Sequence, residues 1–209
     1  MSASDPGRQP AGRPAALMGA ARIPPLPPSE RSDDEVELLA KVGAARDLNL
    51  FTTLIRYPRL FRRWIPLCGG LLTGALPARD RELLILRTAF HCGARYEWAH
   101  HQVLGAEAGL SSEEIDRVRR GPSAPGWSEF DAVLLTAADE LRSLSTLTDP
   151  TWEQLNRRYT TEQMLEVPFV VGQYHLVAFF VNSLRVEVDH DFSQHDHLHQ
   201  PLTDDSSHP

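Results

Sequence analysis

Residues 80–91 constrain the fold of this chain more than any other segment. Apolar side chains occur on nearly every side of a helix drawn over them, at Leu83, Leu84, Leu86, Ala89 and Phe90. A helix of this kind is stable only when other elements cover most of its surface. Pro77 lies just before the segment, where a first-turn proline fits, and Gly93 lies just after it, where a helix commonly stops. The pattern therefore predicts a buried helix at the centre of the protein.

The rest of the body also shows helical periodicity and helix-capping residues. Ser32 with Glu35, and Ser111 with Glu114, have the spacing of a capping box. Further helices are expected at about 49–56, 59–72, 95–108, 112–120, 129–144, 150–159 and 161–184, with bends at Pro66 and Pro168. We find no strand-like alternation and no repeat of fixed period. The sequence predicts an all-α, single-domain helical bundle of about eight helices.

Length and composition place this bundle between two polar ends. The chain has 209 residues, of which 42% are hydrophobic and 23% charged, and this suits one globular domain. Residues 1–30 are Pro-rich and expected to be disordered, residues 31–188 to form the helical domain, and residues 189–209 to be a disordered tail rich in His and Asp. Metal binding by the tail is the alternative, but no ordered scaffold to fix the ligands is visible. Translation from Met1 and from Met18 are both compatible with these boundaries.

The balance of charge excludes two classes of partner. The formal net charge is −7, whereas proteins that bind nucleic acid or anionic membranes need a basic surface. Residues 167–184 are apolar enough to raise the question of a membrane span. They include Gln173 and His175, and a core helix is the preferred interpretation. Without a convincing secretory signal, we expect a cytoplasmic protein with no nucleic-acid or membrane partner.

Cys68 and Cys92 are the two cysteines of the chain. Two cysteines do not make a disulfide framework or a structural zinc site. The preferred interpretation is that they are free thiols in a reducing compartment, packed as small hydrophobic groups. A functional thiol pair is the alternative. We predict no metal site and no cofactor.

Glu82, Glu97 and His101 are the candidate catalytic residues. Glu97 and His101 are four residues apart in one predicted helix, so they lie on the same face. A carboxylate in that position can orient an imidazole and raise its basicity. The helix break at Gly93 lets the preceding helix fold back and bring Glu82 near His101. We therefore predict a proton-transfer site with two carboxylates around one histidine, in which Glu97 orients His101; an ordinary surface pair is the alternative.

Five further residues are candidates for substrate binding: Tyr96, Trp98, Arg87, Tyr174 and His175. Tyr96 and Trp98 flank Glu97 and can form the wall of a pocket, although core packing explains them equally well. Arg87, like Arg81, can attract an anionic substrate, with a structural ion pair as the alternative. Tyr174 and His175 place polar groups in the most apolar helix, where buried polar groups need partners.

Three stretches of the sequence carry a resemblance to a known family. They are Arg79-Asp80-Arg81-Glu82-Leu83-Leu84-Ile85-Leu86-Arg87, Tyr96-Glu97-Trp98-Ala99-His100-His101 and Ala108-Gly109-Leu110-Ser111-Ser112-Glu113-Glu114-Ile115. In order and spacing they resemble the carboxymuconolactone decarboxylase and alkyl hydroperoxidase D-type superfamily, whose members are all-α. Weaker similarity extends from about residue 22 to residue 188.

The resemblance separates two possible chemistries. Alkyl hydroperoxidase D-type members combine a Glu, a Cys-x-x-Cys pair and a His, which would fall on Glu82, Ala94, Glu97 and His101. Both cysteines are therefore absent, and Cys92 is two residues too early. Since a dithiol cycle needs two sulfurs that can meet, that mechanism cannot be carried over.

Decarboxylase-type members instead have a Glu four residues before the His, and Glu97 with His101 fits this arrangement. The resemblance thus implies a cofactor-independent acid–base enzyme of lyase or isomerase type, acting on a small carboxylated or enolisable substrate. A peroxidase or thiol oxidoreductase that uses Cys92 is one alternative, and a non-catalytic oligomeric binding protein is another. The resemblance also implies a homo-oligomer, commonly a trimer or a hexamer.

Overall fold

The computed structural model describes residues 19–196 and 198, and the described part of the chain contains helices and no strands. Its elements are η2 (Pro28–Glu30), α1 (Asp33–Ala40), η3 (Gly43–Asp47), α2 (Asn49–Leu54), α3 (Pro58–Leu72), α4 (Ala78–Cys92), α5 (Arg95–Glu107), α6 (Ser112–Arg120), α7 (Glu129–Leu144), α8 (Asp149–Asn156), α9 (Thr161–Leu184) and η4 (His190–His195), where η marks a 3-10 helix. The predicted all-α fold is confirmed, and residues 19–196 form nine α-helices where about eight were expected.

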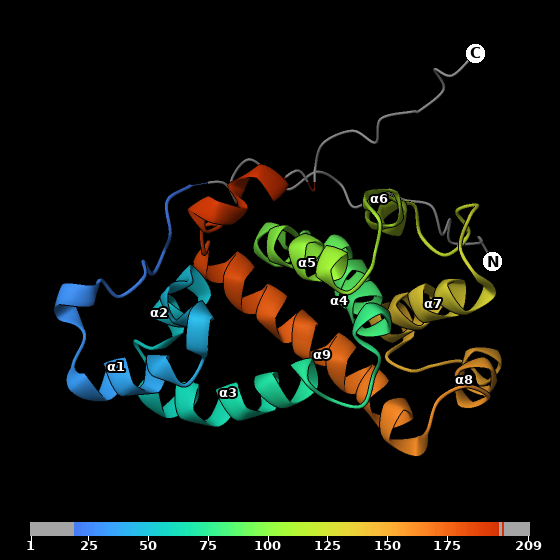
Figure 1. The fold of residues 1–209 in the computed structure, drawn as a ribbon, viewed down its shortest axis with the longest axis horizontal. Coiled ribbons are helices and arrows are strands. Elements are labelled where there is room, and N and C mark those ends of the chain that lie inside the picture. Colours follow the sequence, from blue (N-terminus) through green and yellow to red (C-terminus); the bar gives the residue numbers. More distant parts are fainter. Residues whose placement is uncertain (1–18, 197, 199–209) are drawn as a thin grey trace, which may run out of the picture.

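Helix α4 is the centre of the bundle, as its apolar pattern predicts. It packs against α5, α6, α7 and α9 (Figure 1). Leu83, Leu84, Ile85 and Leu86 are completely buried in the main core. Because α4 is covered on most sides, the few polar side chains that it carries are buried with it, and they include Glu82.

A tight turn at Gly93 reverses the chain between α4 and α5. Gly93 has a left-handed backbone with φ of 57°, a conformation that a glycine adopts without steric cost. The N–H of Ala94 donates to the carbonyl of Ala89 and the N–H of Gly93 to that of Phe90, which is the Schellman arrangement of a helix end. The helix break predicted at Gly93 is confirmed, and α5 folds back along α4.

The predicted capping boxes are present, and the proline effect is smaller than expected. Ser32 caps α1 with Glu35, and Ser111 caps α6 with Glu114. Helices α3 and α9 both continue through their internal prolines, Pro66 and Pro168.

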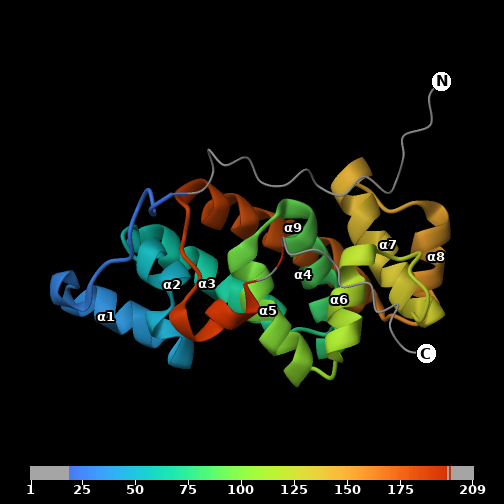
Figure 2. The same cartoon turned by 90° about the horizontal axis from the view of Figure 1, so that it is seen from above.

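Both ends of the described chain extend the body beyond the boundaries expected at residues 31 and 188. Leu26 is buried in a second, smaller core that also contains Leu38, Leu39 and Phe61. After α9, the segment containing η4 lies beside α5 (Figure 2), and the Arg95 guanidinium forms an ion pair with Asp196. The expectations for residues 1–18, 197 and 199–209 lie outside the described residues.

Helix α9 is the element for which a membrane span was weighed. Its best 18-residue window has a mean hydropathy of 1.5, and by length and composition it is long enough to cross a membrane. Half of that window is buried inside the protein, where α9 packs along α4, α3 and α7. This burial supports the interpretation as a core helix. An apolar face remains exposed on α9, formed by Leu165, Phe169, Leu176 and Phe179.

Candidate active site

The centre of the candidate site is a hydrogen bond between Glu82 of α4 and His101 of α5. The distance from Nδ1 of His101 to Oε2 of Glu82 is 2.7 Å. Both side chains are nearly buried, with exposed fractions of 9% for His101 and 3% for Glu82. The partner that orients His101 is therefore Glu82, and the prediction that Glu97 plays this part is wrong. When Nδ1–H donates to the Glu82 carboxylate, Nε2 carries the lone pair and can act as a base.

Close packing of α4 on α5 makes this contact possible. Near the turn, the ring of Phe90 lies 6.4 Å from that of Trp98, and one helical turn beyond His101 the chain has Gly105. A Cβ added at Gly105 would lie 3.3 Å from Cδ1 of Leu86 and 3.9 Å from Cβ of Glu82. The absence of a side chain at position 105 thus lets the two backbones approach, and this approach brings the Glu82 carboxylate to the imidazole.

Glu97 lies in a different environment from Glu82. Its side chain is completely buried, and neither carboxyl oxygen has a hydrogen-bond partner among the described residues. Burial without a partner disfavours the charged form, so the pKa of Glu97 is raised well above its usual value. Glu97 is therefore a buried carboxylic acid that holds its proton.

Tyr174 of α9 completes one wall of the site. Its ring meets the His101 imidazole edge to face, with centroids 4.8 Å apart and an angle of 90°. Burial raises the pKa of Tyr174 well above its usual value, and the nearby acidic groups of Cys68, Glu82 and Glu97 raise it further. The Tyr174 hydroxyl therefore remains protonated and can donate a hydrogen bond.

Arg81 adds a cation with unused hydrogen-bonding capacity. Its Nε atom is buried and lies 3.7 Å from Oε1 of Glu82, which is too far for a hydrogen bond. The side chain is 12% exposed and pairs electrostatically with Glu82, and its Nε–H has no hydrogen-bond acceptor among the described residues. Arg31 is equally buried, yet it donates to the carbonyl of Leu26 and to Asp47. Arg81 is thus a nearly buried guanidinium available to an anionic ligand.

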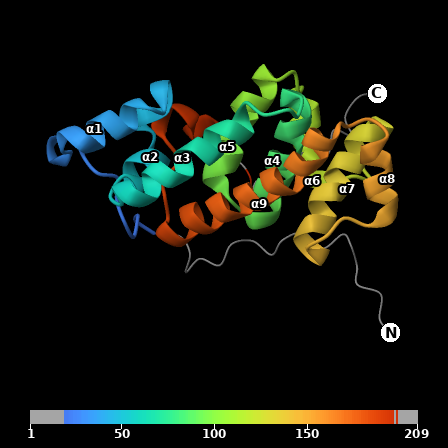
Figure 3. The same cartoon turned by 90° about the horizontal axis from the view of Figure 1, so that it is seen from below.

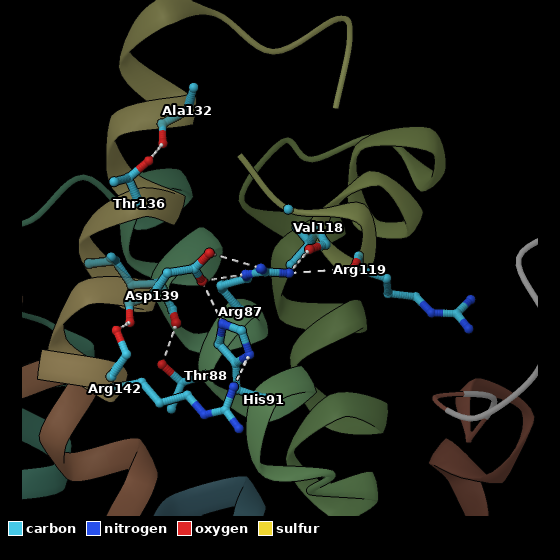
Figure 4. Close-up of polar contacts among 12 residues, drawn as sticks. Arg87, Thr88, His91, Val118, Arg119, Ala132, Thr136, Asp139 and Arg142 are labelled. Carbon is cyan, nitrogen blue, oxygen red and sulfur yellow. Dashed lines mark hydrogen bonds and ion pairs between the residues drawn. The ribbon is translucent and has the colours of Figure 1, made fainter. Parts of the chain in front are cut away.

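The structure places Arg87 in a separate ion-pair network between α4 and α7 (Figure 4). Its guanidinium donates to both Asp139 oxygens, at 2.7 and 2.9 Å, and to the carbonyl of Val118 at 2.8 Å. His91 donates from Nε2 to the same Asp139 at 2.5 Å, and its Nδ1 accepts from Arg142 at 2.7 Å. Burial lowers the pKa of His91, and the charges of Arg87 and Arg142 lower it further against the opposing effect of Asp139. This network joins α4, α6 and α7 and is separate from the Glu82–His101 pair.

Three other predicted substrate-binding residues also lie apart from the pair. The Tyr96 hydroxyl donates to Asp189 at 2.7 Å, which ties α5 to the segment after α9. Trp98 is completely buried in the main core. His175 uses Nδ1 to donate to the carbonyl of Val171 at 2.9 Å. Of the five candidates, Tyr174 is the one whose ring packs against the His101 imidazole.

Cys68 and Cys92 both lie near the buried Glu97, and they do not form a disulfide bond. Both are free, and burial, assisted by the nearby acidic group of Glu97, raises the pKa of each to about 11. Since the thiolate is the reactive form of cysteine, neither Cys68 nor Cys92 is activated for nucleophilic or redox chemistry at neutral pH.

Metal binding was weighed for the tail after Asp189. Among residues 19–196 and 198, no group of three or more His, Cys, Asp or Glu side chains is arranged to hold a metal ion. His190 and His195 belong to η4, whereas positions 197 and 199 of the tail lie outside the described residues.

Sequence reasoning gave Arg81 less weight than its position warrants. A charged residue next to Glu82, in the first turn of a helix that must be buried, is itself a signal of a polar site. A weaker signal pointed to Gly105. A glycine inside a helix lowers stability relative to alanine, so its presence there suggests that close packing requires it.

These features define an all-α protein with a buried carboxylate–histidine site. Residues 58–140, from the start of α3 through most of α7, match the carboxymuconolactone decarboxylase family. The matched segment contains the two helices that carry Glu82, Glu97 and His101.

Solved structures agree with this fold. A peroxidase-related protein from Ralstonia eutropha JMP134 with an alkylhydroperoxidase AhpD core superposes with a TM-score of 0.70 at 18% identity, over 83% of this chain and 96% of that one. The debrominase Bmp8 in complex with 2,3,4-tribromopyrrole gives 0.69 at 14% identity, over 84% and 96%. A peroxidase-related protein from Silicibacter sp. TM1040 gives 0.65 at 10% identity, over 91% and 97%. No curated protein sequence matches the chain.

Proposed function

We propose that this protein is an acid–base enzyme that transfers a proton at a carbon next to a carbonyl or carboxyl group of a small substrate, in a decarboxylation or a related lyase or isomerase reaction. The observation that carries the proposal is the buried 2.7 Å hydrogen bond between Nδ1 of His101 and Glu82. A histidine held in one tautomer by a carboxylate, with its second nitrogen directed to the substrate, is a general base or acid.

The surrounding groups supply the other requirements of this chemistry. Loss of CO₂ or of a proton leaves an enolate, which the enzyme must stabilise and then protonate. Tyr174 can donate a hydrogen bond to the enolate oxygen, and Glu97 is a neutral carboxylic acid within the same buried region. Arg81 can bind a substrate carboxylate through its guanidinium, whose Nε–H has no acceptor among the described residues. The proposed reaction requires no cofactor.

The alternatives receive less support. A peroxidase that uses Cys92 requires a thiolate, and a pKa of about 11 leaves roughly one thiol in ten thousand ionised at pH 7. A non-catalytic binding protein does not need a histidine and two carboxyl groups buried together, which is costly for folding.

Hydrogen–deuterium exchange tests the proposal without knowledge of the natural substrate. A panel of enolisable acids, including 2-oxo acids and a carboxylated lactone, is incubated with the protein in D₂O, and the loss of α-proton signals is followed by NMR. We expect enzyme-dependent exchange that falls at least about 100-fold in His101→Ala and is retained in His175→Gln, whose ring is bonded to the α9 backbone instead. An undiminished rate in His101→Ala, for any acid that the wild type exchanges, would refute the assignment.

We also propose assembly into a homo-oligomer, for which the exposed apolar face of α9 gives support. The side chains of Leu165, Phe169 and Phe179 are exposed to solvent on this face. Exposed apolar faces of this kind commonly mark protein–protein contacts. Sedimentation velocity of wild type and Phe169→Asp tests it. The variant is expected to sediment as a smaller species, and a wild type that is monomeric at all concentrations would contradict the proposal.

A further inference from the structure

A small apolar cavity lies between α3 and α9, with contributions from α2. Its volume is about 170 Å³, and every side chain that lines it is apolar apart from the indole of Trp64. The lining includes Leu50, Leu54, Leu60, Trp64, Val177 and Phe180. The cavity is partly open to solvent, because Leu60 and Leu176 in its lining are exposed. Apolar surface in contact with water is unfavourable unless something covers it, so the presence of this cavity needs an explanation.

The cavity lies one helical turn from the candidate active site. Helices α3 and α9 lie side by side with opposite chain directions (Figure 3). Trp64 and Val177 line the cavity, Cys68 follows Trp64 by four residues along α3, and Tyr174 precedes Val177 by three along α9. In a helix these offsets correspond to adjacent positions on the same face.

Electrostatics agree with this placement. The acidic group of Cys68 helps to raise the pKa of Tyr174, and so do Glu82 and Glu97. Tyr174 in turn contacts the His101 ring. The face shared by α3 and α9 therefore leads from the cavity, by way of Cys68 and Tyr174, towards the proton-transfer residues.

We infer that the cavity is a substrate subsite that holds an apolar group of about the size of a benzene ring, either an aryl ring or a short branched alkyl chain. The inference rests on the proposed function, because the acid–base residues define where the polar end of the substrate lies. A cavity of about 150 Å³ lined by apolar side chains holds benzene in another protein, and the volume here is similar. The cavity offers no charged partner, so the carboxyl and carbonyl groups of the substrate remain at Arg81, His101 and Tyr174.

The substrate class that follows is an enolisable acid with an aryl or short alkyl substituent, rather than an acid as small as pyruvate. Phenylpyruvate and pyruvate are suitable probes, since they share the 2-oxo acid group and differ by the ring. Binding of each to the full-length protein is measured by isothermal titration calorimetry and by ligand-observed NMR. We expect phenylpyruvate to bind at least about tenfold more tightly than pyruvate, because the ring is removed from water in the cavity.

Two variants that fill the cavity from different sides test the location. Val177→Phe fills it from the buried side, and Leu60→Trp fills it from the exposed mouth, where a larger side chain disturbs the core least. Both are expected to abolish the preference for phenylpyruvate and to leave pyruvate binding unchanged. Leu144→Trp is the matched control, because Leu144 is exposed at the end of α7 outside the cavity, and it should retain the preference.

The outcomes distinguish this inference from the proposed function. Equal affinities for the two probes in the wild type, or a preference that survives both filling variants, overturns the subsite even if the protein exchanges protons. Concentration-dependent self-association that Leu60→Trp abolishes would show that a second copy fills the cavity, which also overturns it. A ring preference that persists in His101→Ala, together with no exchange in the wild type, leaves the subsite intact and refutes the proton-transfer function.

Discussion

Replacing Glu97 with glutamine is expected to change how the free energy of unfolding depends on pH. Glu97 is completely buried and has no hydrogen-bond partner among the described residues. Its pKa is about 4.5 in an exposed chain and is raised well above that value by burial in the folded protein. Glutamine has nearly the same shape and no proton to lose, so the variant isolates the titration of this one group.

The sign and size of the effect follow from proton binding. Below pH 4.5 the Glu97 carboxyl is protonated in both the folded and the unfolded state, and it adds no pH dependence. Between the unfolded and the folded pKa, only the folded state holds the proton. The free energy of unfolding then falls by up to about 1.4 kcal/mol for each unit by which the pH rises. This stabilising contribution is lost as the pH increases from the unfolded pKa towards the folded one.

Urea unfolding of wild type and Glu97→Gln at several pH values from about 5 to 6 measures the difference. The stability of the wild type is expected to fall more steeply with pH than that of the variant, with the slopes differing by about 1 kcal/mol per pH unit or more. Glu153→Gln, on the exposed side of α8, is the control and should run parallel to the wild type. Parallel plots for wild type and Glu97→Gln would refute the account of Glu97 as a buried neutral acid.

Three further predictions concern packing, charge and thiol reactivity. Gly105→Leu should lower the free energy of unfolding by about 1–3 kcal/mol in urea, because its side chain must displace Leu86 and Leu110, and it should also slow proton exchange; Gly105→Ala should have a smaller effect, and a Gly105→Leu variant as stable as the wild type would contradict the close approach of α4 and α5. Asp139→Ala should cost about 3–5 kcal/mol, since it leaves the buried Arg87 without its carboxylate, whereas Asp34→Ala breaks an exposed pair and should cost less than about 1 kcal/mol. The cysteines should react with iodoacetamide at pH 7 about 100-fold more slowly than a thiol of pKa 9.0, the difference that a pKa of about 11 implies; alkylation at the rate of a free thiol would disprove their protonated state.

Much of the local structure was predictable because it depends on neighbours in the sequence. The capping boxes at Ser32 and Ser111 and the helix stop at Gly93 are set by side chains within a few residues of each helix end. The burial of α4 follows from its apolar circumference alone. The same reasoning placed Glu82 near His101, because a chain that reverses at Gly93 must pair the two helices.

The position of the polar groups within the site was less predictable. The spacing of Glu97 and His101 on one helix suggested that they form a pair, but in the structure His101 bonds to Glu82, and the Glu97 carboxyl has no hydrogen-bond partner among the described residues. Arg87 and Arg81 were equally plausible anion binders in the sequence. Arg87 donates hydrogen bonds to Asp139 and to the Val118 carbonyl, whereas the Arg81 Nε–H has no acceptor among the described residues.

The sequence by itself determined the helical class, the central helix, the chain reversal and the set of residues from which the site is made. Each of these depends on interactions within one or two helical turns, and residue type and spacing record such interactions directly. Only the tertiary structure decided which carboxyl group meets the histidine, which arginine stays available and where a cavity opens beside them. Those outcomes depend on which side chains from distant segments exclude water from one another, and this is fixed only when α3, α4, α5 and α9 pack together.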